Sequence, residues 1–108
     1  MLNLSHEAAR TFSKVPADLQ VETYKLFLLM IGADPETGKL TIPQREHVPR
    51  YNLFCLLRDA IYKLMLFDNL EEIRLAIQAF VTQILEQKLL TQAQLDLLIR
   101  GLYCDIDP

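Results

Sequence analysis

The chain has 108 residues, of which 51% are apolar, 23% are charged and three are glycine. This composition excludes an intrinsically disordered chain, and the length suits one core, so we expect a single helical domain over residues 1–108. Fourteen acidic residues against 11 basic ones give a net charge of −3, which does not favour binding to nucleic acid.

Membrane insertion and secretion are not expected. The longest uninterrupted apolar stretch, residues 26–31, is far shorter than the roughly 20 residues that a membrane span requires. The first residues lack the basic start and the apolar segment of a secretory signal. The two cysteines, Cys55 and Cys104, do not form a disulfide framework. We therefore expect a cytoplasmic protein with reduced thiols and no membrane partner.

The apolar periodicity predicts an all-α fold, a compact bundle of about five helices. The first helix is expected over residues 5–14, with Ser5 as its N-cap. The second is expected over residues 16–31, because Pro16 suits a first helical turn and Gly32 suits a C-terminal end.

One long loop is expected between the second and third helices, over residues 32–49. Its first part, residues 34–38, combines Asp, Pro and Gly in the order of a turn. Pro43 and Pro49 limit any helix between them to a single short turn, which predicts a third helix over residues 50–67.

Two capping signals predict the remaining helices. Asp68 and Glu71 form a variant capping box, and the apolar residues that follow up to position 85 have the spacing of a one-sided helix. Thr91 and Gln94 form a second capping box, which predicts a fifth helix with one apolar stripe.

The end of the chain is expected to leave the fifth helix. Gly101 should loosen the last turn, and the acidic tail over residues 103–108 shows no helical continuation. We expect this tail to be exposed or to dock on a basic patch.

No catalytic, metal-binding or cofactor-binding constellation can be identified. His6, His47, Cys55 and Cys104 are scattered, so we expect no metal and no cofactor. The one pair of nucleophile and base to consider is Cys55 with His47, but a thiol within an apolar helix is expected to be buried, with a raised pKa. A DNA-recognition helix at residues 92–102 would carry one cation, Arg100. We therefore expect neither an enzyme nor a nucleic-acid-binding protein.

The few clustered charges suggest one candidate polar site. Basic side chains before and within the third helix either solvate the surface or form an edge that binds the carboxylates of a partner or of the acidic tail. The interaction candidates are Arg45, His47, Arg50, Arg58, Asp105 and Asp107.

Residues 26–31 and 51–67 are apolar on nearly every face of their predicted helices. Three shorter helices would leave part of this surface uncovered, so we expect a small interaction or regulatory module that is homodimeric through helices two and three. Another protein partner and complete internal burial are the alternatives. A different function would be a bundle that binds an apolar small molecule in its core. The interface or pocket candidates are Phe27, Met30, Tyr51, Phe54, Tyr62 and Met65.

Overall fold

The computed structural model describes residues 17–67 and 71–106, with the backbone alone described for residues 17–18, 65 and 104–106. Over this part of the chain it contains no strand and has the four helices α2 (Ala17–Ile31), α3 (Gln44–Leu66), α4 (Glu71–Glu86) and α5 (Gln92–Ile106). The expected all-α class is confirmed. The helix expected over residues 5–14 lies outside the described residues and stays a prediction.

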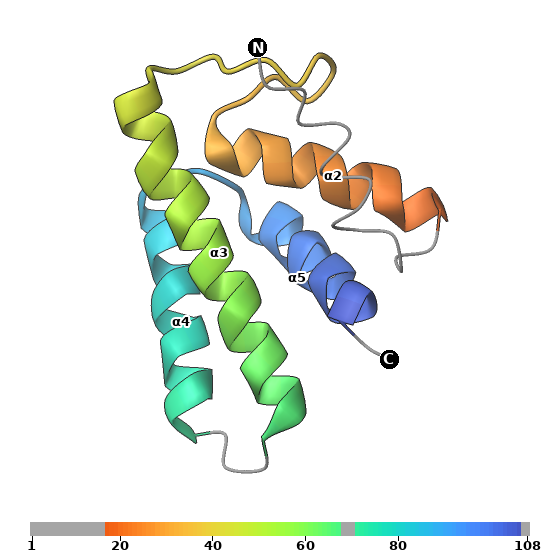
Figure 1. Cartoon of the computed structure of the whole chain (residues 1–108), viewed down its shortest axis with the longest axis vertical. Helices are drawn as coiled ribbons and strands as arrows, with labels where there is room; N and C mark the ends of the chain where they lie inside the picture. The colour runs from red at the N-terminus through yellow and green to blue at the C-terminus, as the bar shows by residue number, and fades with distance from the viewer. Residues whose placement is uncertain (1–16, 68–70, 107–108) are drawn as a thin grey trace.

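The four helices pack as two pairs (Figure 1). α3 and α4 lie side by side as an antiparallel hairpin, α2 packs on α5, and α3 contacts both α2 and α5. The core between the pairs holds fully buried side chains from every helix, including Leu28, Met30, Leu57, Ile84 and Leu98. The α3–α4 hairpin therefore buries the side that faces α2 and α5. No helix among the described residues covers its opposite side.

α2 ends at Ile31 as predicted, and Gly32 closes it. The Ala33 amide donates to the Leu28 carbonyl (2.8 Å) and the Gly32 amide to the Leu29 carbonyl (3.3 Å), which is the Schellman pattern of a helix C-terminus. Gly32 has φ +84°, a conformation that a residue with a Cβ adopts at a cost. The expected turn at residues 34–38 is also confirmed, with the Asp34 carboxylate accepting from the Glu36 amide at 2.7 Å.

α3 begins earlier than predicted, and the loop before it is correspondingly shorter. Pro43 is the N-cap, the helix starts at Gln44, and Pro49 lies inside it. Pro49 has no amide N–H, so the carbonyl of the exposed residue Arg45 has no i+4 amide in α3 to accept from. His47 offsets this loss, because its Nδ1 donates to the Ile31 carbonyl at 2.7 Å and so ties the first turns of α3 to the end of α2.

α5 begins as predicted and ends later. The Gln94 amide donates to Thr91 Oγ1 (3.2 Å) and the Thr91 amide to Gln94 Oε1 (2.9 Å), so the capping box is confirmed. The helix then continues to Ile106, and the prediction of a non-helical tail from residue 103 is wrong. Gly101 does not loosen this helix, because it packs directly on Thr23 of α2.

α4 also ends in the Schellman pattern, but with a lysine at the left-handed position. Lys88 has φ +57°, the Leu89 amide donates to the Ile84 carbonyl (3.1 Å) and the Lys88 amide to the Leu85 carbonyl (3.1 Å). Because glycine adopts this conformation without steric cost, Lys88→Gly should raise the free energy of unfolding by about 1 kcal/mol, measured by urea denaturation. Lys88→Ala keeps the strain and should show no such gain; equal stabilisation by both variants would contradict this account.

Candidate interaction surface

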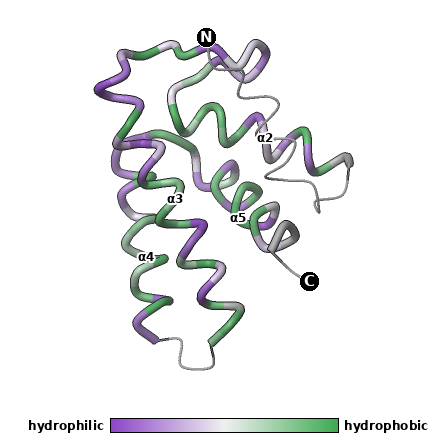
Figure 2. Tube along the Cα trace, in the orientation of Figure 1, coloured by the Kyte–Doolittle hydropathy of each residue, from purple (hydrophilic) through white to green (hydrophobic). Residues whose placement is uncertain are grey.

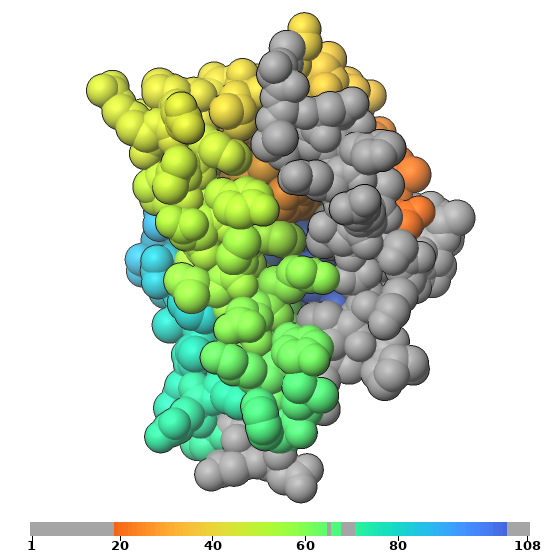
Figure 3. Space-filling view, viewed as in Figure 1, coloured from red at the N-terminus to blue at the C-terminus, as the bar shows by residue number. Residues whose placement is uncertain are grey.

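Among the described residues, the exposed apolar side chains are concentrated on α3. In the described part of the chain ten large apolar side chains are exposed, and six of them belong to α3 or directly follow it. These six are Val48, Tyr51, Leu56, Tyr62, Leu66 and Phe67. Figure 3 shows α3 side chains facing the viewer over the length of the helix, with α4 beside them. We call the exposed surface of α3 that these side chains occupy, with the groove that α3 forms against α4, the α3 outer face.

α2 contributes little to this exposed surface. The apolar segment at its C-terminal end is almost entirely covered, with Leu26, Phe27, Leu28, Met30 and Ile31 all buried. The expectation that both apolar helices would leave surface uncovered is therefore wrong for this part of α2. The reason is that α2 packs on both α5 and α3, so its sides are shared between two neighbours.

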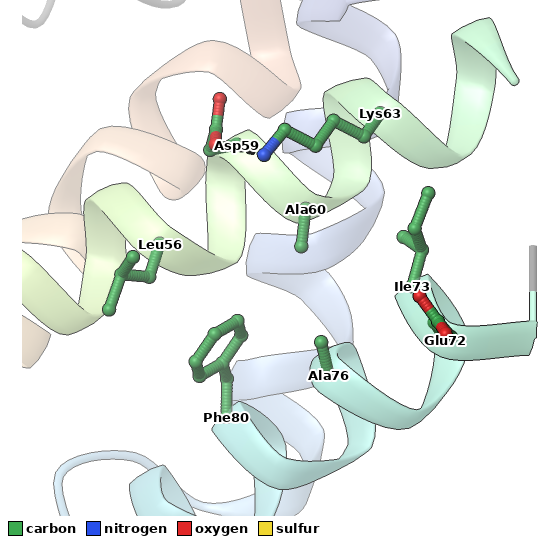
Figure 4. Close-up of a pocket in the computed structure, with 8 residues that line it drawn as sticks. All are labelled: Leu56, Asp59, Ala60, Lys63, Glu72, Ile73, Ala76 and Phe80. Atoms are coloured by element: carbon green, nitrogen blue, oxygen red, sulfur yellow. Dashed lines mark ion pairs between the residues drawn. The ribbon is translucent and has the colours of Figure 1, made fainter.

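A hollow of about 210 Å³ opens between α3 and α4 on the α3 outer face. Figure 4 shows the small residues Ala60 and Ala76 at its centre, with Leu56 and Phe80 together at one end. Asp59, Lys63 and Glu72 stand at its rim, and Lys63 Nζ lies 3.2 Å from Asp59 Oδ2. The remaining lining residue is Ile73. An apolar floor with a charged rim is typical of a site that accepts side chains of another protein.

The hollow continues along α3 over Asn52, Cys55, Leu56 and Asp59. Cys55 is a free, exposed cysteine, so its expected burial in the core is wrong. Partial burial still raises the pKa of the Cys55 thiol, an effect that a hydrogen bond with Tyr51 and the charge of Arg58 partly offset. The thiol is therefore protonated near neutral pH, which makes Cys55 part of an apolar surface and a poor nucleophile.

The structure does not bring Cys55 and His47 together. The two residues are eight positions apart on α3, which corresponds to roughly 12 Å along a helix. His47 is engaged elsewhere, since its Nδ1 donates to the Ile31 carbonyl and its ring lies 5.8 Å from the Tyr51 ring. This geometry does not pair the Cys55 thiol with the His47 imidazole.

The basic candidates do not share one face of α3. Arg45 is exposed, and the helical register places it roughly 160° around the axis from His47. Arg50 is half-buried and its guanidinium lies beside Gly32. Arg58 is half-buried, and the helical register places it on the same side of α3 as His47. An edge made by all of these side chains is therefore not formed, and Arg45 alone stands on the α3 outer face.

The acidic tail cannot be placed against these basic residues. Asp107 lies outside the described residues, and for Asp105 the backbone alone is described, within α5. Docking of the tail on a basic patch stays a prediction.

The six interface or pocket candidates divide between the core and the surface. Phe27 packs edge-on against Phe54, with ring centroids 4.5 Å apart, and Met30 is fully buried beside them in the core cluster. Tyr51 and Tyr62 are exposed, whereas Met65 is described by its backbone alone. The described members therefore do not line one common cavity.

Neither a metal site nor a membrane span is found within residues 17–67 and 71–106. No group of three or more His, Cys, Asp or Glu side chains there could hold a metal ion. No helix in the same ranges is both long and apolar enough to cross a membrane. No protein-family model matches the chain, and comparison with curated proteins and with solved structures gives no match either. The described residues therefore define only a class, an all-helical domain with an apolar outer face.

Sequence reasoning missed the hollow between α3 and α4. Its signal is a pair of alanines, Ala60 and Ala76, which stand among larger apolar residues and face each other in the hairpin. Small residues at facing positions leave space between two helices where larger ones would fill it. The pairing of α3 with α4 had to be known before that signal could be recognised.

Proposed function

We propose that the protein is a small, non-catalytic interaction module that works as a homodimer through the α3 outer face. The observation that carries this proposal is the concentration of exposed Leu, Tyr, Val and Phe side chains on one helix. Large apolar side chains that are exposed together on one element mark sites of protein association in folded proteins. The proposal differs from the sequence expectation in one respect, since α2 is largely covered and α3 supplies the interface.

The dimensions of the hairpin suit an interface of ordinary size. The 23 residues of α3 span about 34 Å, and two adjacent helices are about 20 Å wide. The projected area is therefore roughly 700 Å², close to the roughly 800 Å² that each partner buries in a stable complex. A face of this size can hold a dimer without support from α2.

The test compares two leucines that are exposed to a similar degree on different faces. Leu56, 52% exposed, lies in the hollow of the α3 outer face, whereas Leu75, 56% exposed, lies on the side of α4 opposite the buried Ile84. Leu56→Glu places a charge in the proposed interface and should raise the dimer dissociation constant by about 100-fold. Leu75→Glu adds the same charge outside the proposed interface and should change the dimer dissociation constant by less than about threefold.

The measurement is mass by light scattering after size-exclusion chromatography, over a range of protein concentrations. A dimer that Leu56→Glu dissociates and Leu75→Glu preserves would support the proposal. A parent protein that stays monomeric at every concentration, or a dimer that both variants dissociate equally, would overturn it.

A further inference from the structure

We infer that the second copy pairs its α3 antiparallel to the first, with Cys55 and Leu56 of both copies next to the two-fold axis. The inference rests on the homodimer proposed above and specifies how its two chains are arranged. Cys55 is the central residue of α3, and the hollow over Asn52, Cys55, Leu56 and Asp59 lies at the middle of the α3 outer face.

The polar residues on the α3 outer face match those of a second copy only when the two α3 helices run antiparallel. Asn52 and Asp59 are seven positions apart, one on each side of Cys55 and Leu56, and both are exposed. In an antiparallel pair centred there, Asn52 of each copy lies opposite Asp59 of the other, so that an amide can donate to a carboxylate at two equivalent places. In a parallel pair, Asp59 would face its own copy and the two carboxylates would repel each other.

The intrachain ion pair at this face does not prevent that contact. Asp59 and Lys63 are one helical turn apart, and their side chains are 59% and 54% exposed, so their mutual attraction is weak. A carboxylate has two oxygens that can each accept more than one hydrogen bond. Asp59 can therefore keep Lys63 and accept from the amide of a second copy.

The charges at the two ends of the hairpin favour the same direction. Figure 2 shows hydrophilic residues at the start of α3 and, at the far end of the hairpin, at the start of α4. Arg45 stands exposed at the first of these ends, and Glu71 and Glu72 stand exposed at the second. Antiparallel pairing places Arg45 of one copy at the level of Leu66 in the other, next to the beginning of α4. Parallel pairing would bring like charges together at both ends.

Thiol cross-linking tests this arrangement directly. In a Cys104→Ser protein, Cys55 is the remaining thiol. Dibromobimane, a short reagent that bridges neighbouring thiols, should link two copies at alkaline pH, where the Cys55 thiol ionises. In a protein with Cys55→Ser and Cys104→Ser, Asn52→Cys and Asp59→Cys are then made separately. An equimolar mixture should cross-link at least tenfold faster than either variant alone, because only the mixture places one thiol opposite another. Each mixed dimer also retains one intact pair of Asn52 with Asp59.

The possible outcomes separate this inference from the proposed function. Fast cross-linking of the mixture, with the far-ultraviolet circular dichroism of every variant unchanged, supports the antiparallel arrangement. Faster linking within Asn52→Cys alone and within Asp59→Cys alone means a parallel dimer, and dimeric mass without linking at any of the three positions means an interface elsewhere. Both results overturn the inference. The parallel result leaves the homodimer through the α3 outer face intact, whereas an interface elsewhere also removes the α3 outer face from the proposed function. A monomeric parent protein overturns both.

A charge exchange provides a second test that needs no new thiol. Arg45→Glu and Glu72→Arg should each weaken the dimer several-fold, measured by the same light-scattering titration, and the double variant should recover the parent value within about twofold. If the double variant weakened the dimer by the sum of the two single effects, the two charges would not face each other. That result would overturn the antiparallel arrangement.

Discussion

Gly101→Ala is expected to lower the free energy of unfolding by about 2–3 kcal/mol, although alanine favours helix more than glycine does. Gly101 is buried in α5 against α2, and a Cβ there would overlap Oγ1 and Cγ2 of Thr23 and lie 2.9 Å from its Cβ. Thr23 cannot turn away easily, because it is fully buried and its Oγ1 donates to the Leu19 carbonyl at 2.8 Å. The added methyl group must therefore push the two helices apart.

Urea denaturation followed by circular dichroism measures this effect, with Arg100→Ala as the matched control. Arg100 is exposed and adjacent in the same turn of α5, so its replacement should change the stability by less than about 0.5 kcal/mol. Adding Thr23→Ala removes Oγ1 and Cγ2, the two Thr23 atoms nearest to the new methyl group, and should restore at least about 1 kcal/mol of the loss. Stabilisation by Gly101→Ala would instead mean that α2 and α5 are farther apart than described.

Two local patterns predicted local features of this fold correctly. Thr91 with Gln94, and Gly32 at the end of α2, need only a few neighbouring residues to form their hydrogen bonds, so the sequence around them contains the whole signal. Gly101 and Pro49 were misread because distant contacts decide their roles. Gly101 meets Thr23 of another helix, and the turn before Pro49 is held by a bond between His47 and the end of α2.

The α3 outer face was only partly predictable for a related reason. The sequence showed that α3 has more apolar residues than one face can hold, which correctly indicated leftover apolar surface on this helix. Residues 53–57 are all apolar, so their periodicity could not show which of them point outward. Packing against α2, α4 and α5 settles this, because it buries Leu53, Phe54 and Leu57 while it leaves Cys55 and Leu56 exposed.

Leu57→Ala and Leu56→Ala should therefore have different consequences, although the two residues are adjacent. Leu57 is fully buried in the core cluster, so its truncation leaves a cavity and should lower the free energy of unfolding by about 3 kcal/mol at every protein concentration. Leu56 lies roughly 100° further around the helix on the outer face, and its truncation should cost the isolated chain less than about 1 kcal/mol.

The dependence on protein concentration separates a role in folding from a role in assembly. If the α3 outer face binds a second copy, the dimer adds stability that grows with concentration, and Leu56→Ala should lose part of that increment while Leu57→Ala keeps it. Urea denaturation at low and at high protein concentration measures both effects in one experiment. An equal loss for Leu56→Ala at both concentrations would mean that this side chain only packs within its own chain, and the α3 outer face would then have no part in self-association.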